Sequence, residues 1–220
     1  MTGFLKETAT AREIEALGLL GPPVVRVLEV RRDGVLLERV DPGESLVGYD
    51  DDVATAELAL AMRSMWVPVP EGCGLPTLAE ECLPLFSTDV PLAAEAQRVL
   101  RDLLASSPEP VVLHGDLHHG NLLRGHDGWV AIDPHGVVGD PAYDVGPLLL
   151  NPWGADVAHL ARHRLDVLAT VLGTDRDRLQ AWGFVRAVLS AAWTREDTGQ
   201  LDERVLDVAR LLHSPSRTWT

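Results

Sequence analysis

The spacing of apolar residues near the start of the chain predicts a small mixed unit of strands and one helix. Apolar positions at helical spacing over residues 10–20 end at a Gly-Pro-Pro stop signal. Two β-branched or leucine-rich runs, residues 24–30 and 35–40, flank Asp33-Gly34, a dipeptide typical of hairpin turns. With a short strand at Phe4-Leu5, the pattern predicts the order strand, helix, strand, strand.

Helical periodicity dominates after Asp41-Pro42-Gly43, which predicts a boundary between two lobes at these residues. A buried strand is predicted at residues 111–113, and a hairpin with strands at 121–123 and 129–132. Residues 68–84 hold four prolines and two glycines and are predicted to form a loop. Helices are predicted over residues 51–66, 90–105, 143–150, 157–172, 175–194 and 202–213.

The composition is that of a protein with a hydrophobic core. Of 220 residues, 46% are hydrophobic and 24% are charged, which excludes wholesale disorder. The balance of 19 Lys and Arg against 33 Asp and Glu gives a net charge of -14, so we expect neither a nucleic-acid nor a membrane partner. The two cysteines cannot form a disulfide framework, and the chain opens without the apolar region of a signal peptide, so a cytoplasmic location is expected.

Several common catalytic motifs are missing from the sequence. It contains no P-loop and no G-x-G-x-x-G, which excludes the nucleotide sites built on those loops. Residues 43–47 lack the second glycine of a nucleophile elbow, and no histidine begins an H-E-x-x-H zinc motif. The remaining candidate is the dense polar segment that follows the predicted strand at residues 111–113.

The polar segment at residues 114–121 has the spacing of a kinase catalytic loop. Four residues separate Asp116 from Asn121. In such loops the aspartate accepts the proton of the substrate hydroxyl, and the asparagine ligates Mg²⁺. Asp133 ends the next predicted hairpin and would supply a second metal contact. Because carboxylate and amide oxygens suit the hard Mg²⁺ ion, the pattern predicts metal-assisted phosphoryl transfer.

The sequence resembles the aminoglycoside phosphotransferases, and within them the streptomycin 6-kinase and hydroxyurea phosphotransferase group. The most specific resemblance is His-Gly-Asp-Leu-His-His-Gly-Asn at residues 114–121. The similarity extends over nearly all of residues 5–213. The other matching segments are residues 36–39, 132–134, 139–144 and 190–197.

The resemblance implies an α+β fold of the bilobal protein-kinase type, with a partial nucleotide-binding lobe over residues 1–40 and a helical lobe over residues 41–220. It implies an ATP- and Mg²⁺-dependent kinase of the antibiotic-resistance type that phosphorylates a hydroxyl of an aminoglycoside-like or hydroxyurea-like acceptor. This acceptor is a small molecule, and we expect it to be cationic. In the family, two strands joined by a phosphate-covering loop precede the phosphate-binding lysine, whereas only residues 1–5 precede it here, so weak ATP binding is expected.

Matched position by position, the resemblance assigns the catalytic base to Asp116. It assigns the Mg²⁺ ligands to Asn121 and Asp133. Lys6, the only lysine of the chain, is assigned to the α- and β-phosphates of ATP, with Glu13 as its partner on the following helix. A compact ammonium at this place is not readily replaced by arginine.

The resemblance also suggests residues for the rest of ATP and for the acceptor. Glu38 to Val40 resemble the hinge whose backbone contacts adenine. Glu15 is the alternative partner for the lysine. Glu196 and Asp197 are candidates for binding a cationic acceptor, because acidic residues near the end of a helix are otherwise unfavourable there.

Two alternatives to an active kinase stay open. The first is an inactive or regulatory kinase-like remnant that lacks the phosphate-covering loop. The second is a metal-dependent hydrolase with ligands from His114, Asp116 and His118.

Nearby polar residues have structural interpretations. His114 is expected to orient the loop, whereas His119, His126 and His135 are expected to be solvated. Asp144 is expected in the first turn of a helix, where a carboxylate is favourable.

Overall fold

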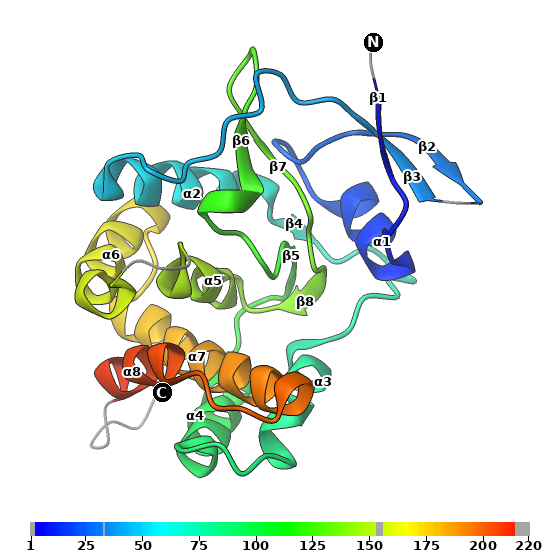
Figure 1. Cartoon of the computed structure of the whole chain (residues 1–220). Coiled ribbons are helices and arrows are strands. Elements are labelled where there is room, and N and C mark those ends of the chain that lie inside the picture. The colour runs from blue at the N-terminus through cyan, green and yellow to red at the C-terminus, as the bar shows by residue number, and fades with distance from the viewer. Residues whose placement is uncertain (1–2, 33, 153–155, 214–220) are drawn as a thin grey trace.

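The computed structural model describes residues 3–32, 34–152 and 156–213. A small sheet with one helix lies at one end of the molecule, and a larger, mainly helical part makes up the rest (Figure 1). The predicted turn residue Asp33 lies outside the described residues. Within the described ranges, no helix combines the length and apolar character needed to cross a membrane.

The N-terminal part folds into three antiparallel strands and one helix, as predicted. Thr10 caps the helix, because its hydroxyl accepts a hydrogen bond from the backbone N–H of Glu13. Buried apolar side chains join the helix to the sheet, and they include Leu17, Val35 and Leu37. The strand order is β1-β3-β2. The elements are β1 (Gly3–Lys6), α1 (Ala11–Leu19), β2 (Val27–Arg31) and β3 (Gly34–Glu38).

Helices make up most of the remaining chain, and the long helix α7 is packed against α4, α5, α6 and α8 (Figure 1). Its side chains Trp182 and Phe184 are buried, and apolar burial of this size is a main source of stability. The helices are α2 (Asp51–Met65), α3 (Leu78–Glu81), α4 (Ala93–Ala105), α5 (Val145–Leu150), α6 (Val157–Leu172), α7 (Arg176–Thr198) and α8 (Glu203–Leu212).

Short strands within the helical part deliver the polar loops. Strand β5 is central in the order β4-β5-β8, and its Val112 and Leu113 are buried immediately before the polar segment 114–121. The hairpin β6-β7 leads directly to Asp133. These strands are β4 (Val67–Pro68), β5 (Val111–Leu113), β6 (Leu122–Arg124), β7 (Trp129–Ala131) and β8 (Val137–Gly139).

The segment 68–84 is not the continuous loop that its prolines predicted. It contains helix α3, and a 3₁₀ helix follows at Leu83–Phe86. Thr77 and Glu80 form a capping box, in which the Thr77 N–H donates to the Glu80 carboxylate at 2.8 Å and the Glu80 N–H donates to the Thr77 hydroxyl at 3.3 Å. The Thr-x-x-Glu signal was present in the sequence, and it outweighs the neighbouring prolines.

Candidate active site

A buried histidine fixes the backbone of the polar loop. Nε2 of His114 lies 3.0 Å from the carbonyl oxygen of Ile132, and the backbone N–H of Asp116 donates to Nδ1 at 3.2 Å. Burial lowers the pKa of His114 to about 4, so the ring is neutral at pH 7 with its proton on Nε2. Both ring nitrogens are therefore engaged, as expected for an orienting residue.

A second buried residue, Asp144, holds the start of the same loop. Its carboxylate accepts the backbone N–H groups of His114 at 3.2 Å and Gly115 at 2.7 Å, and the indole N–H of Trp66 at 2.9 Å. Burial raises the pKa of Asp144 to about 6, although these hydrogen bonds act to lower it. Asp144 does lie at the start of α5, but its side chain stabilises the polar loop and makes no capping hydrogen bond to that helix.

Asn121 is hydrogen-bonded to the residue predicted as the catalytic base. Its amide nitrogen donates to the backbone carbonyl of Asp116 at 2.9 Å and lies 3.5 Å from the Asp116 carboxylate. The nitrogen is thus engaged by the loop, and the amide oxygen is the atom left for a metal. The Asp116 side chain is 42% exposed, so a substrate hydroxyl can reach it.

Lys6 connects the small sheet to Asp133. Its Nζ lies 2.7 Å from the Glu13 carboxylate and 2.8 Å from that of Asp133. Glu15 instead accepts the backbone N–H of Gly74 at 2.6 Å, so Glu13 is the partner of Lys6 in this structure. Burial opposes the charge of Lys6, but the hydrogen bonds and charges of its two acidic partners raise its pKa above the usual value, so the ammonium is protonated at pH 7.

Asp133 has an unusual backbone conformation. Its φ is 57°, in the left-handed backbone region that residues other than glycine seldom adopt. The backbone N–H of Ile132 donates to the carbonyl of Asn121 at 3.0 Å, so the β6-β7 pairing brings the two predicted metal ligands to neighbouring positions. Backbone strain of this kind is concentrated at functional sites.

A cavity of about 470 Å³ is bordered by Asp133 and by the predicted hinge. Glu38 and Val40 both line it, and the Glu38 side chain is paired with Arg26 at 2.8 Å. The walls suit a planar ring of low polarity, because most of the lining is apolar. The apolar lining residues are Phe4, Val25, Leu37, Val40, Pro42, Leu123 and Ile132.

The placement of the predicted base, the two predicted metal ligands and Lys6 is compatible with phosphoryl transfer. Residues 19–198 match the family described as "Aminoglycoside/hydroxyurea antibiotic resistance kinase". The chain belongs to this family.

Two curated relatives illustrate the similarity. The streptomycin 6-kinase of Streptomyces glaucescens is 37% identical over 216 residues, which cover 87% of this chain and 69% of that protein. The hydroxyurea phosphotransferase of Kitasatospora aureofaciens is 37% identical over 212 residues, which cover 87% of this chain and 61% of that protein.

Solved structures share the fold at low sequence identity. A choline/ethanolamine kinase family protein from Mesorhizobium loti has a TM-score of 0.66 and 17% identity, over 96% of this chain and 80% of that one. Aminoglycoside phosphotransferase APH(4)-Ia has a TM-score of 0.58 and 18% identity, also over 96% and 80%. The predicted protein-kinase-like fold of the α+β class is therefore confirmed.

Family membership confirms the assignment to the phosphotransferases and disfavours the inactive remnant. The metal-dependent hydrolase is disfavoured as well, because both ring nitrogens of His114 are engaged. Among the described residues, no group of three or more His, Cys, Asp or Glu side chains is placed to hold a metal ion. An Mg²⁺ site of the kinase type needs fewer protein ligands, because nucleotide phosphates and waters complete it.

The two acidic residues suggested for the acceptor lie near the end of α7 and are exposed. Glu196 lines a separate cavity of about 300 Å³, together with Asp89 and Arg195. Asp89 and Arg195 neutralise each other, with nitrogen and oxygen atoms 3.0 Å apart. In the described part of the kinase, no ion pair connects Glu196 or Asp197 to the polar loop.

One charged residue close to the catalytic base was missed. Arg186, in the middle of α7, lies 3.6 Å from the Asp116 carboxylate and is 6% exposed. A charged residue on the buried face of an apolar helix was the available sequence signal. Its partner could not be found from the sequence, because Asp116 belongs to a distant loop.

A buried carboxylate, also missed, connects α1 to the segment after Asp133. Glu81 accepts a hydrogen bond from Arg12 at 2.7 Å and lies 2.8 Å from Nε2 of His135. The Nε of Arg12 donates to the carbonyl of Gly136 at 2.6 Å. Burial opposes the charge of Glu81, but these two partners lower its pKa below the usual value. Helix α1, which carries the partner of Lys6, is thereby fixed to the segment that follows the predicted metal ligand Asp133.

The solvated positions predicted for the other histidines are correct only in part. His126 and His135 are exposed, as predicted, and His135 also contacts Glu81. His119 is buried, with neither ring nitrogen hydrogen-bonded within the described residues, so that prediction is wrong. Burial lowers the pKa of His119 to about 4. The reason lies in distant contacts: the residue belongs to a tight 3₁₀ turn, and its ring is close enough to Asp51 of α2 and Arg164 of α6 for their charges to affect its pKa.

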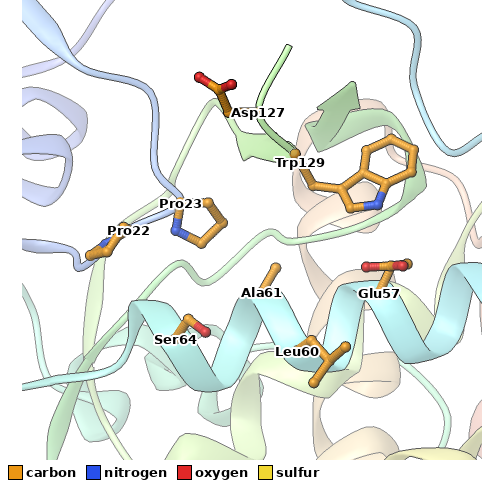
Figure 2. Close-up of a pocket in the computed structure, with 9 residues that line it drawn as sticks. Pro22, Pro23, Glu57, Leu60, Ala61, Ser64, Asp127 and Trp129 are labelled. Carbon is orange, nitrogen blue, oxygen red and sulfur yellow. The ribbon is translucent and has the colours of Figure 1, made fainter. Parts of the chain in front are cut away.

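A further cavity of about 350 Å³ lies between α2, the Pro22-Pro23 turn and the β6-β7 hairpin (Figure 2). Figure 2 shows Trp129 and Asp127 above the helix and Glu57 on it. None of the residues predicted for catalysis lines this cavity.

Proposed function

We propose that this kinase transfers the γ-phosphoryl group of ATP to a hydroxyl group of a small acceptor of the aminoglycoside or hydroxyurea type. We further propose that the acceptor is cationic, which favours an aminoglycoside, because hydroxyurea is uncharged at pH 7. The observation that supports the proposal best is that Lys6, paired with Glu13 near the start of the chain, also contacts Asp133, whose neighbour Ile132 is hydrogen-bonded to the loop that holds Asp116. Such a set can position both substrates of phosphoryl transfer.

In the proposed reaction Asp116 is the general base. The acceptor O–H gives its proton to the Asp116 carboxylate while the acceptor oxygen forms a bond to the γ-phosphorus. The bond from that phosphorus to the bridging oxygen breaks, and its electron pair leaves with ADP. Asp116 then loses the proton to solvent. Its exposed side chain, held at the end of an ordered loop, suits this role.

Lys6 is proposed to bind the α- and β-phosphates, with Glu13 holding its ammonium in place. The ammonium is already directed toward Asp133, at the border of the cavity of about 470 Å³. Adenine is proposed to occupy that cavity, with polar contacts from the backbone of residues 38–40. This proposal follows from the apolar walls, which favour a ring over a charged group.

The residues present suit Mg²⁺. Asn121 has its amide oxygen available, because its nitrogen is hydrogen-bonded to the loop. Asp133 has a carboxylate 46% exposed at the same place. We propose that these two residues hold the ion, which would neutralise charge on the transferred phosphoryl group.

The negative charge of the protein supports a cationic acceptor. The chain has a net charge of -14, and Glu196 and Asp197 are exposed at the end of α7. We propose that these two acids attract the acceptor rather than bind the nucleotide.

The two-lobe division at residues 1–40 and 41–220 belongs to the same proposal, and it would place ATP between the lobes. A separate cluster of buried residues in the small sheet supports it.

The test is a direct search for the phosphorylated product. The purified protein is incubated with Mg²⁺ and ATP and, in separate reactions, with streptomycin, hydroxyurea or a neutral disaccharide, and products are identified by mass spectrometry. Phosphorylated streptomycin, formed much more slowly by Asp116→Asn, is the expected result, whereas phosphorylation of the neutral hydroxyurea alone would contradict the cationic acceptor. No product from any acceptor with folded protein, or full activity of Asp116→Asn, would contradict the proposal.

A further inference from the structure

Arg186 is a buried cation with few protein partners. It lies in α7 between Val185 and Ala187, which are also buried, and it is 6% exposed. Its Nε has no hydrogen-bond acceptor among the described residues. Among the described residues, Asp116 has the one carboxylate within ion-pair distance of the Arg186 guanidinium, at 3.6 Å.

The burial of the Arg186 charge lowers the stability of the folded protein. A guanidinium removed from water loses its hydration, and hydrogen bonds normally compensate for that loss. A second deeply buried arginine, Arg164, shows the usual solution, because it is hydrogen-bonded to Asp51 and to the carbonyls of Leu148 and Asn151. Arg186 lacks such a set, so its charge is retained at a cost in stability.

The surroundings of Arg186 hold its side chain in one place. The Trp193 ring lies 4.5 Å from the guanidinium carbon, and the Tyr143 ring lies 5.9 Å from it. Gly146 on α5 makes room for the stem, because a Cβ at that glycine would come within 2.6 Å of the Arg186 Cβ. The guanidinium is therefore aligned by packing instead of by hydrogen bonds.

We propose that Arg186 is a positioning residue that holds the Asp116 carboxylate in the orientation needed for proton transfer. The inference rests on the proposed function of Asp116 as the base. At 3.6 Å the guanidinium attracts the carboxylate but does not donate a normal hydrogen bond to it. The lone pairs of Asp116 thus stay available for the proton of the acceptor.

The other neighbours of Asp116 fit the same arrangement. Nε2 of His118 lies 3.8 Å from its carboxylate, and the amide nitrogen of Asn121 lies 3.5 Å away. All three donors are therefore at long range. A close, bidentate arginine would have oriented the base equally well, but it would have occupied both oxygens.

Arg186 acts through Asp116 and not as a phosphate ligand. Its side chain is 7% exposed, whereas that of Asp116 is 42% exposed. A phosphoryl group needs open N–H donors, and the Nε of Arg186 is enclosed by protein. The more exposed carboxylate of Asp116 is therefore the group of this pair that a substrate can reach more readily.

The experiment compares steady-state phosphotransfer by the wild-type enzyme, Arg186→Met and Arg186→Lys. Arg186→Met keeps the length of the side chain and removes its charge. We expect it to lower kcat about 100-fold, as a misplaced catalytic group does, with the KM for ATP unchanged. Arg186→Lys should recover part of kcat, because it restores the positive charge. Arg178→Met is the matched control on the same helix, since Arg178 pairs with Asp140 and does not contact Asp116.

Chemical rescue separates positioning from folding. In Arg186→Ala, guanidinium ion at concentrations too low to unfold the protein should raise kcat, whereas urea, a neutral molecule of the same shape, should not. Rescue by guanidinium alone supports the inference, and equal effects of both molecules, or of neither, overturn it.

A double mutant tests whether the effect passes through the base. In an Asp116→Asn background, Arg186→Met should cause no further loss of the residual rate. An additional loss of the same size as in wild type would assign Arg186 to the phosphoryl group and overturn the inference. If wild-type enzyme makes no product, the proposed function fails. If wild-type enzyme is active and Arg186→Met keeps its kcat, only the role of Arg186 fails.

Discussion

Lys6 donates a 2.8 Å hydrogen bond to the Asp133 carboxylate, although the two residues are 127 positions apart along the chain. The contact crosses from the end of β1 to the loop after β7, so it fixes the small sheet to the segment that holds a proposed metal ligand (Figure 1). ATP phosphates and Mg²⁺ are also proposed to bind here. Bound nucleotide would therefore separate the two partners of this ion pair, because the Lys6 ammonium would contact the phosphates and the Asp133 carboxylate would contact the ion.

Lys6→Met should nearly abolish phosphotransfer. We expect kcat/KM for ATP to fall at least ~100-fold, the scale seen when a preorganised charge is removed from a developing charge. Lys6→Arg should recover little, because a planar guanidinium does not fit the place of a compact ammonium between Glu13 and Asp133. Steady-state kinetics with varied ATP measure the effect.

Glu15→Gln is the matched control for this variant. Glu15 lies on the same helix as Glu13, but it binds the backbone of Gly74. Its kcat/KM for ATP should remain that of the wild type. Full activity of Lys6→Met would show that the phosphates bind elsewhere.

Asn121→Ala should weaken the response to Mg²⁺ more than the affinity for ATP. The variant loses the amide oxygen proposed as a ligand, so the Mg²⁺ concentration for half-maximal rate should rise roughly 10- to 100-fold. Asn121→Asp keeps an oxygen at the same place and should need far less additional metal. A titration with Mg²⁺ at saturating ATP tests both variants, and an unchanged Mg²⁺ requirement in Asn121→Ala would exclude Asn121 as a ligand.

The sequence was sufficient for those parts of the site that depend on local spacing. Asp116 and Asn121 lie in one short loop, and the hairpin that follows gives the position of Asp133, so hydrophobic patterning and a kinase spacing identified all three. Lys6 and Glu13 were matched through the family resemblance, and the structure places them 2.7 Å apart. The roles of these residues stay predictions that the experiments above test.

Contacts between distant segments could not be predicted. Arg186 and Glu81 show no local motif, because each acquires its meaning from a partner that only the folded chain brings near. His119 was placed wrongly for the same reason, since its burial depends on helices that pack over the 3₁₀ turn. The two- and three-residue strands β4 and β8 are too short to show a period of two.

Glu81→Gln should loosen the attachment of α1. The variant removes the buried charge that pairs with Arg12 and contacts His135, and we expect a loss of about 3 kcal/mol in the free energy of unfolding. The KM for ATP should also rise, because α1 carries Glu13. Denaturant unfolding and ATP kinetics measure the two effects.

Glu80→Gln provides the control for that substitution. Glu80 is the neighbouring residue, but it is exposed and contributes only to the capping box of α3. It should leave the KM for ATP unchanged. An equal rise in KM in both variants would assign the effect to α3 and not to the contacts of Glu81.

Asp144 should make the stability of the enzyme depend on pH in a direction opposite to most carboxylates. Burial raises the pKa of Asp144 from the usual 3.8 of an aspartate to about 6. Between these two values the folded state binds more protons than the unfolded state, so the free energy of unfolding falls as the pH rises through this range. This rise in pKa corresponds to a fall of roughly 3 kcal/mol in the free energy of unfolding across the range.

Asp144→Asn removes this titration while it keeps one oxygen for the N–H groups of the loop. The stabilities of both proteins are measured by denaturant unfolding between pH 4 and pH 7. Subtracting one from the other removes the contributions of the groups that titrate in both. The stability of wild type minus that of the variant should decrease up to about pH 6 and then become constant. A difference that grows with pH would mean that the hydrogen bonds from His114, Gly115 and Trp66 outweigh burial, and that the loop is held by a carboxylate that favours its charged form.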